Sequence, residues 1–355
     1  MRDRAVAGGR CKEAAITKRC SGFYKIFCFI DIDWQFKTMP QNHTGFALVN
    51  KLNDELEINA FLYLPDKVGG GSAGSVVASR LSEEPCVTVL LLEAGAKKPP
   101  LLNDVPGLGR FFWGTDIDWQ FKTVPQKNTG FALVNKQVPW PSGKGLGGSS
   151  LLNAMLYVRG NRKDYDNWAA LGAKGWSYKD VFPYFLKLED NRDFGYSLNG
   201  YHASGGPITA EKPGYHPEIK NRILEAAEQL GYRVVDSNAA RQTGFHDLQG
   251  NLRNGQRCNT AKAYLVPVEN RTNLDIIGGA HVKKVVFEGS RAVGVQFDYK
   301  NSEYLVKARR EVIMSAGTTN TAQLLMLSGI GPKKHLQKFN VKCQYIFNLS
   351  ALKVK

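Results

Sequence analysis

The sequence lacks the features that mark several large classes of protein. It contains no run of the ~18 consecutive apolar residues that a membrane-spanning helix requires, so no transmembrane segment is expected. The apolar stretch Phe27–Ile30 is too short for the core of a signal peptide, so none is expected and the compartment is left open. The six cysteines form no C-x-x-C pair and match no zinc-ligand spacing, so no metal site is predicted.

Acidic residues are scarce relative to basic ones, with 32 Asp and Glu against 47 Lys and Arg, a net charge of +15. Ten basic and two acidic residues fall between Lys300 and Lys355, so +8 comes from the last 56 residues. That tail contains no motif of aromatic and basic residues of the kind that stacks nucleic-acid bases. We interpret it as a solvated basic surface and expect no nucleic-acid partner. A basic interaction protein is the weaker alternative, and it would require salt-sensitive binding to an anionic polymer.

One segment occurs twice in the chain. Residues 31–51 and 116–136 agree at 18 of 21 positions, at an offset of 85 residues. Two copies do not make a solenoid, because repeat architectures need three or more units. The second copy runs into the motif PWPSGKGLGGSS, whereas the first runs into residues 52–67, which have no clear period. We therefore interpret the first copy as a duplicated or misjoined piece, and the second as the native one.

With 355 residues, of which 43% are hydrophobic, the chain can form one large domain or two ordinary ones. Helical and strand patterns alternate from Val68 onward, which indicates an α/β fold. The spacing predicts helices over 75–81, from near Ser149, and over 178–188, 217–230 and 321–327. Buried strands are predicted over 87–92 and 311–315, and strands of a meander over 274–277, 282–287 and 292–297.

A glycine motif before the first of these helices suggests a dinucleotide site. Residues 69–74 contain G-x-G-x-x-G, in which the glycines permit a tight turn, approach of a pyrophosphate and close helix packing. Glu93 follows an apolar strand 19 residues after Gly74, where a carboxylate can accept the ribose hydroxyls. The alternatives are a chance glycine turn beside a surface glutamate, or the nucleophile elbow G-x-S-x-G at 70–74. The elbow does not explain Glu93, and Gly145 after Gly143-Lys144 excludes a P-loop.

Longer motifs resemble one family, the glucose–methanol–choline (GMC) flavin oxidoreductases, in particular their animal glucose-dehydrogenase-like branch. The resemblance covers roughly residues 69–340. It rests on GGGSAGSVVASRLSE at 69–83, TVLLLEAG at 88–95, GKGLGGSSLLNAMLYVRGNRKDYD at 143–166, NWAALGAKGWSYKDVFPYFLKLED at 167–190, HASGGP at 202–207 and GTTNTAQLLMLSGIGP at 317–332.

The resemblance implies an FAD-binding Rossmann-like domain, made of a parallel sheet and a β-meander, with a partial α+β substrate domain. The FAD-binding domain would comprise residues 66–177 and 246–345, and the substrate domain 178–245. Residues 1–65 would be an irregular segment that contains the first repeat copy, and 346–355 an aberrant tail.

The resemblance also implies an activity: FAD accepts hydride from the C–H of an alcohol or sugar substrate and passes electrons to a separate acceptor. Relatives are often secreted. The matching positions imply that the cofactor is bound by Gly69, Gly71, Ser72, Gly74, Glu93, Gly147, Gly148, Ser149, Asn153, Val282, Ala316 and Gly317. Asn153 could instead be an amide satisfied within a helix, and Val282 an ordinary strand residue.

The chain departs from the family pattern in two places that matter. Pro65-Asp66-Lys67 interrupts the apolar strand expected before Gly69, which puts FAD affinity in question. After Pro332 the family's histidine-containing region is absent, so we expect a truncated chain, name no catalytic residue and give its six histidines structural or surface roles. Weak or no turnover is then expected, and the alternative to an oxidoreductase is a non-catalytic flavin-binding remnant or pseudoenzyme.

Overall fold

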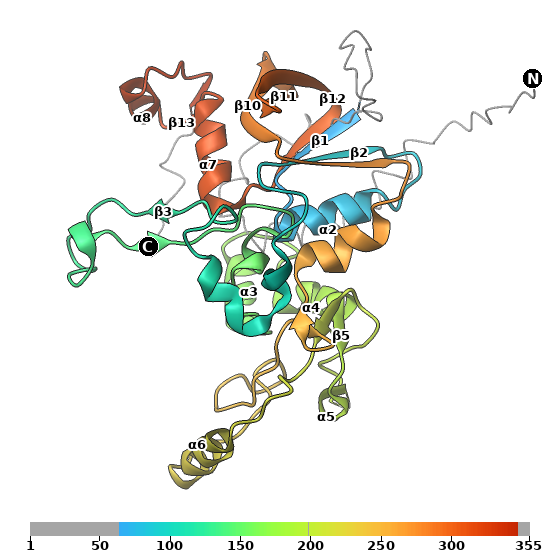
Figure 1. Ribbon diagram of the computed structural model, residues 1–355, viewed down its shortest axis with the longest axis vertical. Helices are drawn as coiled ribbons and strands as arrows, with labels where there is room; N and C mark the ends of the chain where they lie inside the picture. Colours follow the sequence, from blue (N-terminus) through green and yellow to red (C-terminus); the bar gives the residue numbers. More distant parts are fainter. Residues whose placement is uncertain (1–63, 198, 347–355) are drawn as a thin grey trace, which may run out of the picture.

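A six-stranded sheet forms the centre of the computed structural model, which describes residues 64–197 and 199–346. The strand order is β10-β11-β12-β1-β2-β9 (Figure 1). The strands are β1 (Leu64–Val68), β2 (Val89–Glu93), β9 (Leu274–Gly278), β10 (His281–Glu288), β11 (Arg291–Tyr299) and β12 (Ser302–Met314). The sheet confirms an α/β fold.

The long strand β12 joins two kinds of sheet. Its first half pairs antiparallel with β11, which pairs antiparallel with β10, and its second half pairs parallel with β1. The sequence predicted only the buried end of β12, because the exposed half alternates with polar residues. The assignment of 274–277 to the meander was wrong: β9 lies parallel to β2 at the other edge of the sheet.

The segment before the glycines forms a strand despite Pro65, Asp66 and Lys67. β1 lies between β12 and β2 and pairs parallel with both, from Asp66 to Val68, with an irregularity between Leu64 and Asp66. The interruption expected from the sequence is therefore confined to Pro65, and the backbone pairs regularly from Asp66 onward. The strand begins at Leu64, inside the segment predicted to be irregular, whereas the first repeat copy lies outside the described residues.

Helix α2 (Ser72–Leu81) connects β1 to β2 and packs beside the π-helical turn Ala261–Leu265, while α7 (Gly317–Leu327) packs against β10. Helix α2 begins three residues earlier than predicted. Strand β2 is buried along its whole length, as parallel strands covered on both faces are. The core around it comprises Val68, Ala78, Leu146, Leu265, Val282, Val285, Val295, Phe297, Val306, Met314 and Leu324, among others.

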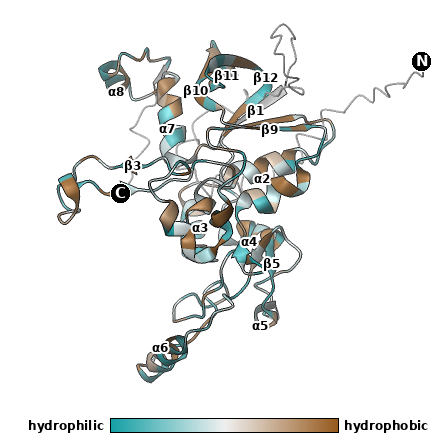
Figure 2. Cartoon of the chain, in the orientation of Figure 1, coloured by the Kyte–Doolittle hydropathy of each residue, from teal (hydrophilic) through white to brown (hydrophobic). Residues whose placement is uncertain are grey.

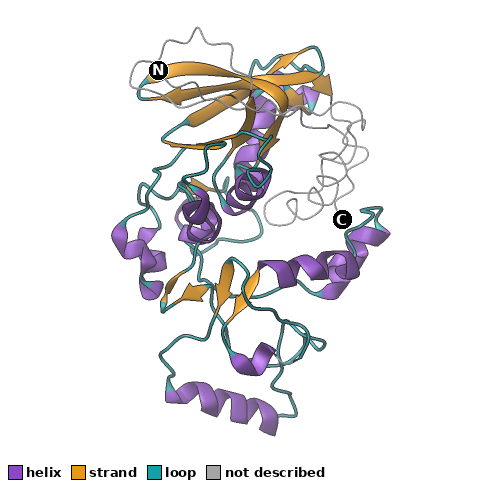
Figure 3. Ribbon diagram, turned by 90° about the vertical axis from the view of Figure 1, so that its right-hand side faces the viewer, coloured by secondary structure: helices purple, strands orange, loops and turns teal. Residues whose placement is uncertain are grey.

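A second part of the chain extends from one end of the sheet domain. It contains α4 (Tyr178–Leu188), α5 (Phe194–Ser197), α6 (Glu218–Gln229) and the short parallel pair β5 (Glu189–Asn191) and β6 (Ile208–Ala210). Figure 3 shows these strands apart from the central sheet, with α6 at the far end. Hydrophobic and hydrophilic residues both occur along α6 in Figure 2. Predictions of α4 and α6 are confirmed, and the domain boundary at 178–245 stays a prediction.

The helix predicted from Ser149 is only a 3-10 turn, Gly148–Leu151. Gly147, Gly148 and Met155 have φ of 104°, 52° and 60°, which an α-helix cannot accommodate. Leu152 and Met155 are nevertheless buried, because the irregular segment packs inward. Leu156, expected on the same face, is 54% exposed, so the apolar spacing predicted neither a helix nor a single buried face correctly.

The remaining elements are short. They are β3 (Phe121–Lys122), β4 (Pro139–Trp140), α3 (Arg162–Ala170), β7 (Leu252–Arg253), β8 (Gln256–Arg257), β13 (Ile330–Gly331), α8 (Lys333–Lys338) and β14 (Tyr345–Ile346). Across residues 64–197 and 199–346, none of the helices has the length and apolarity needed to cross a membrane.

Candidate functional site

Three glycine-containing segments meet at the end of β1. The N–H of Gly69 donates to Leu92 O at 2.8 Å, and the N–H of Gly147 donates to Gly70 O at 2.8 Å. A Cβ atom on Gly69 would lie 2.5 Å from Ser315 O, and one on Gly148 would lie 2.6 Å from the Gly71 Cα. Side chains at these positions would drive the segments apart, so the sequence needs glycine here for backbone contact.

The same end of β1 leads into the N-terminus of α2. Gly71 is the N-cap residue, no side chain caps the helix, and its first turn contains no acidic residue. The first helical turn starts when the N–H of Ser75 bonds to Gly71 O at 2.8 Å. A helix start with its positive dipole end uncovered by carboxylates favours a bound phosphate.

Glu93 closes the cradle from the end of β2. Its side chain is buried, with Oε2 accepting from the N–H of Gly70 and Oε1 accepting from the N–H of Gly95, both at 2.8 Å. Burial raises the pKa of the Glu93 carboxyl, although these backbone N–H groups and the Lys144 ammonium act in the opposite direction. The two hydrogen bonds hold the carboxyl at the rim of the glycine cradle.

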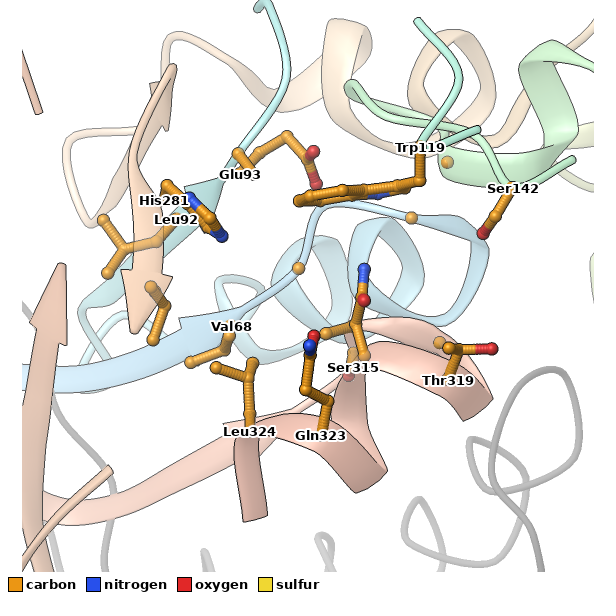
Figure 4. A pocket seen from close by; sticks show the side chains of 18 of the residues that line it. Val68, Leu92, Glu93, Trp119, Ser142, His281, Ser315, Thr319, Gln323 and Leu324 are labelled. Atoms are coloured by element: carbon orange, nitrogen blue, oxygen red, sulfur yellow. The ribbon is translucent and has the colours of Figure 1, made fainter. Parts of the chain in front are cut away.

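These groups line a cavity of about 680 Å³, in the size range of small-molecule sites. Figure 4 shows Glu93 and Trp119 on one side of it, and Ser315, Thr319 and Gln323 on the other. Eight of the twelve residues implied by the resemblance line the cavity: Gly69, Gly71, Glu93, Gly148, Ser149, Val282, Ala316 and Gly317. They come from segments more than 200 residues apart in the chain.

The other four lie behind the lining or away from it. Ser72 and Gly74 are in the first turn of α2, and Gly147 supports Gly70 through its backbone. Asn153 points elsewhere: its Oδ1 accepts from the N–H of Met155 at 3.1 Å and from Arg257 Nη1 at 3.0 Å. Asn153 thus fastens a turn, which matches the alternative in which its amide group is satisfied locally, although the surrounding segment is not helical.

Sequence reasoning missed Trp119, which also lines the cavity. Its neighbour Asp118 is 5% exposed and accepts hydrogen bonds from three backbone N–H groups, those of Gly114, Gln120 and Ser142. Both residues belong to the segment that occurs twice in the sequence. The motif DIDWQF ahead of PWPSGKGLGG was the available signal.

A second group of buried charges lies outside the cavity. Glu189 accepts hydrogen bonds from Arg159 Nη2 and from His202 Nδ1, and the other ring nitrogen of His202 lies 2.8 Å from Asp236 Oδ2. The side chains of Arg159, Glu189 and His202 are at most 2% exposed. Burial lowers the pKa of the His202 imidazole, but the carboxylates of Asp236 and Glu189 outweigh this effect and raise the pKa to about 9.

Both ring nitrogens of His202 lie within hydrogen-bond distance of carboxylate oxygens, although the Asn191 amide nitrogen also lies 3.0 Å from Nδ1, so the two carboxylates favour the doubly protonated, charged imidazole. Of the histidines that the structure describes, only His281 lines the cavity. Within those same residues, no group of three or more His, Cys, Asp or Glu side chains could hold a metal ion.

Comparison with known proteins connects this geometry to a family. The GMC oxidoreductase family profile matches residues 67–345. The glucose dehydrogenase [FAD, quinone] of Drosophila pseudoobscura pseudoobscura is 45% identical over 278 residues, which cover 78% of this chain and 44% of the relative.

Two solved structures are similar in fold. The pyridoxine 4-oxidase from Mesorbium loti has a TM-score of 0.73 and 31% identity, covering 79% of this chain and 54% of that one. An FAD-dependent oxidoreductase from Chaetomium thermophilum has a TM-score of 0.71 and 29% identity, covering 80% and 50%. This chain thus spans about half the length of the proteins it matches. The family profile and the glycine cradle together show that the chain belongs to the GMC oxidoreductases.

Proposed function

We propose that this chain binds FAD and takes part in the oxidation of a CH–OH group in a small alcohol or sugar. The names of similar proteins support both the cofactor and the reaction class, since the Drosophila relative is a glucose dehydrogenase that uses FAD and a quinone. Pyridoxine 4-oxidase, by its name, oxidises a small ring compound. The electron acceptor is proposed to be a separate quinone, dye or oxygen molecule.

One observation carries the proposal. Backbone from the ends of β1 and β12 and from the turn Gly147–Ser149 meets around a single cavity, and side chains would obstruct the contacts at Gly69 and Gly148. The N-terminus of α2 opens beside it, and the buried carboxyl of Glu93 stands at its edge. Such a cradle fits a dinucleotide, whose diphosphate needs close backbone approach and whose ribose needs an acceptor.

The chain's own residues would then act by binding and orienting. Gly69, Gly71 and the first turn of α2 would hold the diphosphate, and Glu93 would accept the hydroxyls of the adenosine ribose. The peptide of Val282, buried in β10, would meet the adenine, and Ala316 and Gly317 would cover the other side. Bound FAD supplies the redox chemistry, because its ring accepts the hydride of the alcohol.

We further propose that this chain alone turns over alcohols weakly or not at all. Oxidation of a hydroxyl needs a base within hydrogen-bond reach of it. Among the described histidines, His202 is enclosed between two carboxylates, and His281 lies at the edge of the cavity beside Trp119. A chain that binds FAD without turnover is the second candidate. It is favoured because His202 is engaged by two carboxylates and His281 packs beside Trp119.

The first test is to purify the chain, denature it and measure released FAD by absorbance and fluorescence. The proposal expects close to one FAD per chain, or binding on reconstitution with added FAD. A folded chain that takes up no FAD under either condition would refute it. With FAD bound, a panel of alcohols and sugars with a quinone dye separates the candidates, because reduction of the dye excludes the non-catalytic one.

A further inference from the structure

We propose that Trp119 is a stacking platform for the adenine ring of the dinucleotide in this cavity. The inference rests on the proposed binding of FAD, and it assigns a binding contact to a residue outside the glycine and carboxylate motifs. Planar aromatic side chains recognise bases through their faces, and such a contact tolerates any base.

The position of Trp119 identifies which end of the dinucleotide it meets. Its indole lies across the cavity beside the Glu93 carboxyl, with His281 on the same side (Figure 4). The ring centroids of Trp119 and His281 are 5.6 Å apart. Because Glu93 is the acceptor for the adenosine ribose, the ring next to it meets the base attached to that ribose. Val282, which follows His281 in β10, reaches the same part of the cavity.

The backbone around Trp119 is fixed independently of any ligand. The N–H of Trp119 donates to Ser142 O at 2.9 Å, and the N–H of Lys144 donates to Ile117 O at 2.8 Å. The Asp118 carboxylate accepts from the N–H of Ser142 at 2.9 Å and from that of Gln120 at 3.0 Å. These contacts hold the backbone of Trp119 against the segment Ser142–Lys144, of which Ser142 and Gly143 line the cavity. Ligand binding therefore loses little conformational entropy in ordering this residue.

Two further contacts orient the indole itself. Phe121 stacks parallel to it, with ring planes 4° apart and centroids 5.9 Å apart. The Lys144 ammonium lies 5.1 Å from the ring centroid, in a cation–π arrangement. Trp119 remains half-buried at the cavity, which is the arrangement expected of a ring held from behind and open toward a ligand.

The test compares three ligands in one set of proteins. ADP carries the adenosine end alone, FMN carries the isoalloxazine end alone, and FAD carries both. Affinities are measured by calorimetry and by flavin fluorescence for the unaltered chain, Trp119→Ala, Trp119→Phe and the control Trp113→Ala. Trp113 is a half-exposed tryptophan outside the cavity lining, and it controls for the general loss of a surface indole.

Removal of the platform should weaken ADP and FAD binding about 10- to 100-fold, the usual contribution of a base–aromatic stack. Trp119→Phe should stay within about threefold of the unaltered chain, because phenylalanine keeps a planar face. Trp113→Ala should bind all ligands as before, and FMN affinity should not respond to Trp119→Ala. ADP should also quench tryptophan fluorescence in the unaltered chain but not in Trp119→Phe.

Several results would overturn the assignment. Unchanged ADP affinity in Trp119→Ala, or a loss confined to FMN, would place the indole away from adenine. If Trp119→Ala fails to fold, the quenching by ADP decides, and its absence in a chain that binds ADP refutes the stack. An unaltered chain that binds neither FAD nor ADP would refute the proposed function itself, which is a different outcome from FAD binding that ignores Trp119.

Discussion

Raising the pH should destabilise this chain through one side chain, His202. Its imidazole lies in a fully buried position between Glu189 and Asp236, where both ring nitrogens face carboxylate oxygens. Loss of the ring proton would leave one of those oxygens facing a lone pair of the buried ring. The carboxylates also gather Arg159, so four chain segments meet at this cluster.

The size of the effect follows from the pKa of His202, which is raised from 6.5 to about 9. At 1.36 kcal/mol for each pKa unit, this difference corresponds to about 3 kcal/mol. Below pH 6.5 the folded and unfolded chains both hold the proton, so the stabilisation is complete. Between pH 6.5 and 9 only the folded chain holds it, so the free energy of unfolding falls as the pH rises, and above pH 9 the contribution is gone.

Urea denaturation between about pH 6 and pH 9.5 measures this loss directly. Buried tyrosines do not interfere in that window: burial raises the pKa of Tyr264 to about 12 and that of Tyr157 as well, so both keep their protons. His202→Gln should be less stable at pH 6 by about 3–5 kcal/mol, because the buried carboxylate of Glu189 and the partly buried one of Asp236 lose a cation. It should also lose the dependence on pH.

His335→Asn is the matched control, since His335 is exposed on α8. It should keep both the stability and the pH dependence of the unaltered chain. A free energy of unfolding that stays constant from pH 6.5 to pH 9 in the unaltered chain would refute the charged state assigned to His202. The same conclusion would follow if His202→Gln kept the full slope.

Substitutions at Glu93, Gly148 and Asp118 test the residues around the cavity. Glu93→Gln should lower the free energy of unfolding by about 1–3 kcal/mol in urea and weaken FAD binding, because its amide NH₂ would face a backbone N–H. Gly148→Ala should abolish FAD retention in a released-flavin assay, since the φ of Gly148 is +52° and the new Cβ would press on Gly71. In the control Gly107→Ala the new Cβ meets nothing within 4 Å, so this variant should retain FAD. Asp118→Ala should weaken ADP binding about as much as loss of the Trp119 indole does, and Asp118→Asn should restore part of the affinity. Equal ADP affinity in the unaltered chain and both Asp118 variants would count against the role of Asp118 in positioning Trp119.

Local sequence specified the parts of the fold that local chemistry determines. Helix α4 begins at Tyr178 as predicted because Ser177 and Asp180 form a reciprocal cap. This cap lies within four consecutive residues, so it can be predicted without knowing what the helix packs against. Strand β9, in contrast, has the same composition as a meander strand, and only its pairing with β2 makes it parallel. The strand β1 forms for the same reason, since hydrogen bonds from β2 and β12 hold backbone that propensity alone would leave irregular.

The candidate site divides in a similar way. The sequence singled out the glycines and Glu93 because the dinucleotide motif prescribes residue types at fixed spacing, and the structure brings these residues to one cavity. The contact between Asn153 and Arg257 could not be predicted, since Arg257 lies 104 residues away in the chain. The buried charges around His202 were equally hidden, because Asp236 is 34 residues from it and no spacing rule connects them. Contacts between residues so far apart in the sequence become visible only in the folded structure.

The duplicated segment shows most directly that a site depends on its partners. Asp33-Trp34 and Asp118-Trp119 have identical neighbours on both sides. Asp118, however, accepts from the N–H of Ser142, 24 residues onward, and Trp119 bonds to the same residue. At the equivalent distance from Asp33 the sequence has Glu57 and no PWPSGKGLGGSS motif, and this first copy lies outside the described residues. In the sequence, the segment Ser142–Lys144 that contacts Asp118 and Trp119 follows the second copy and not the first, so the repeated residues alone do not define this part of the cavity.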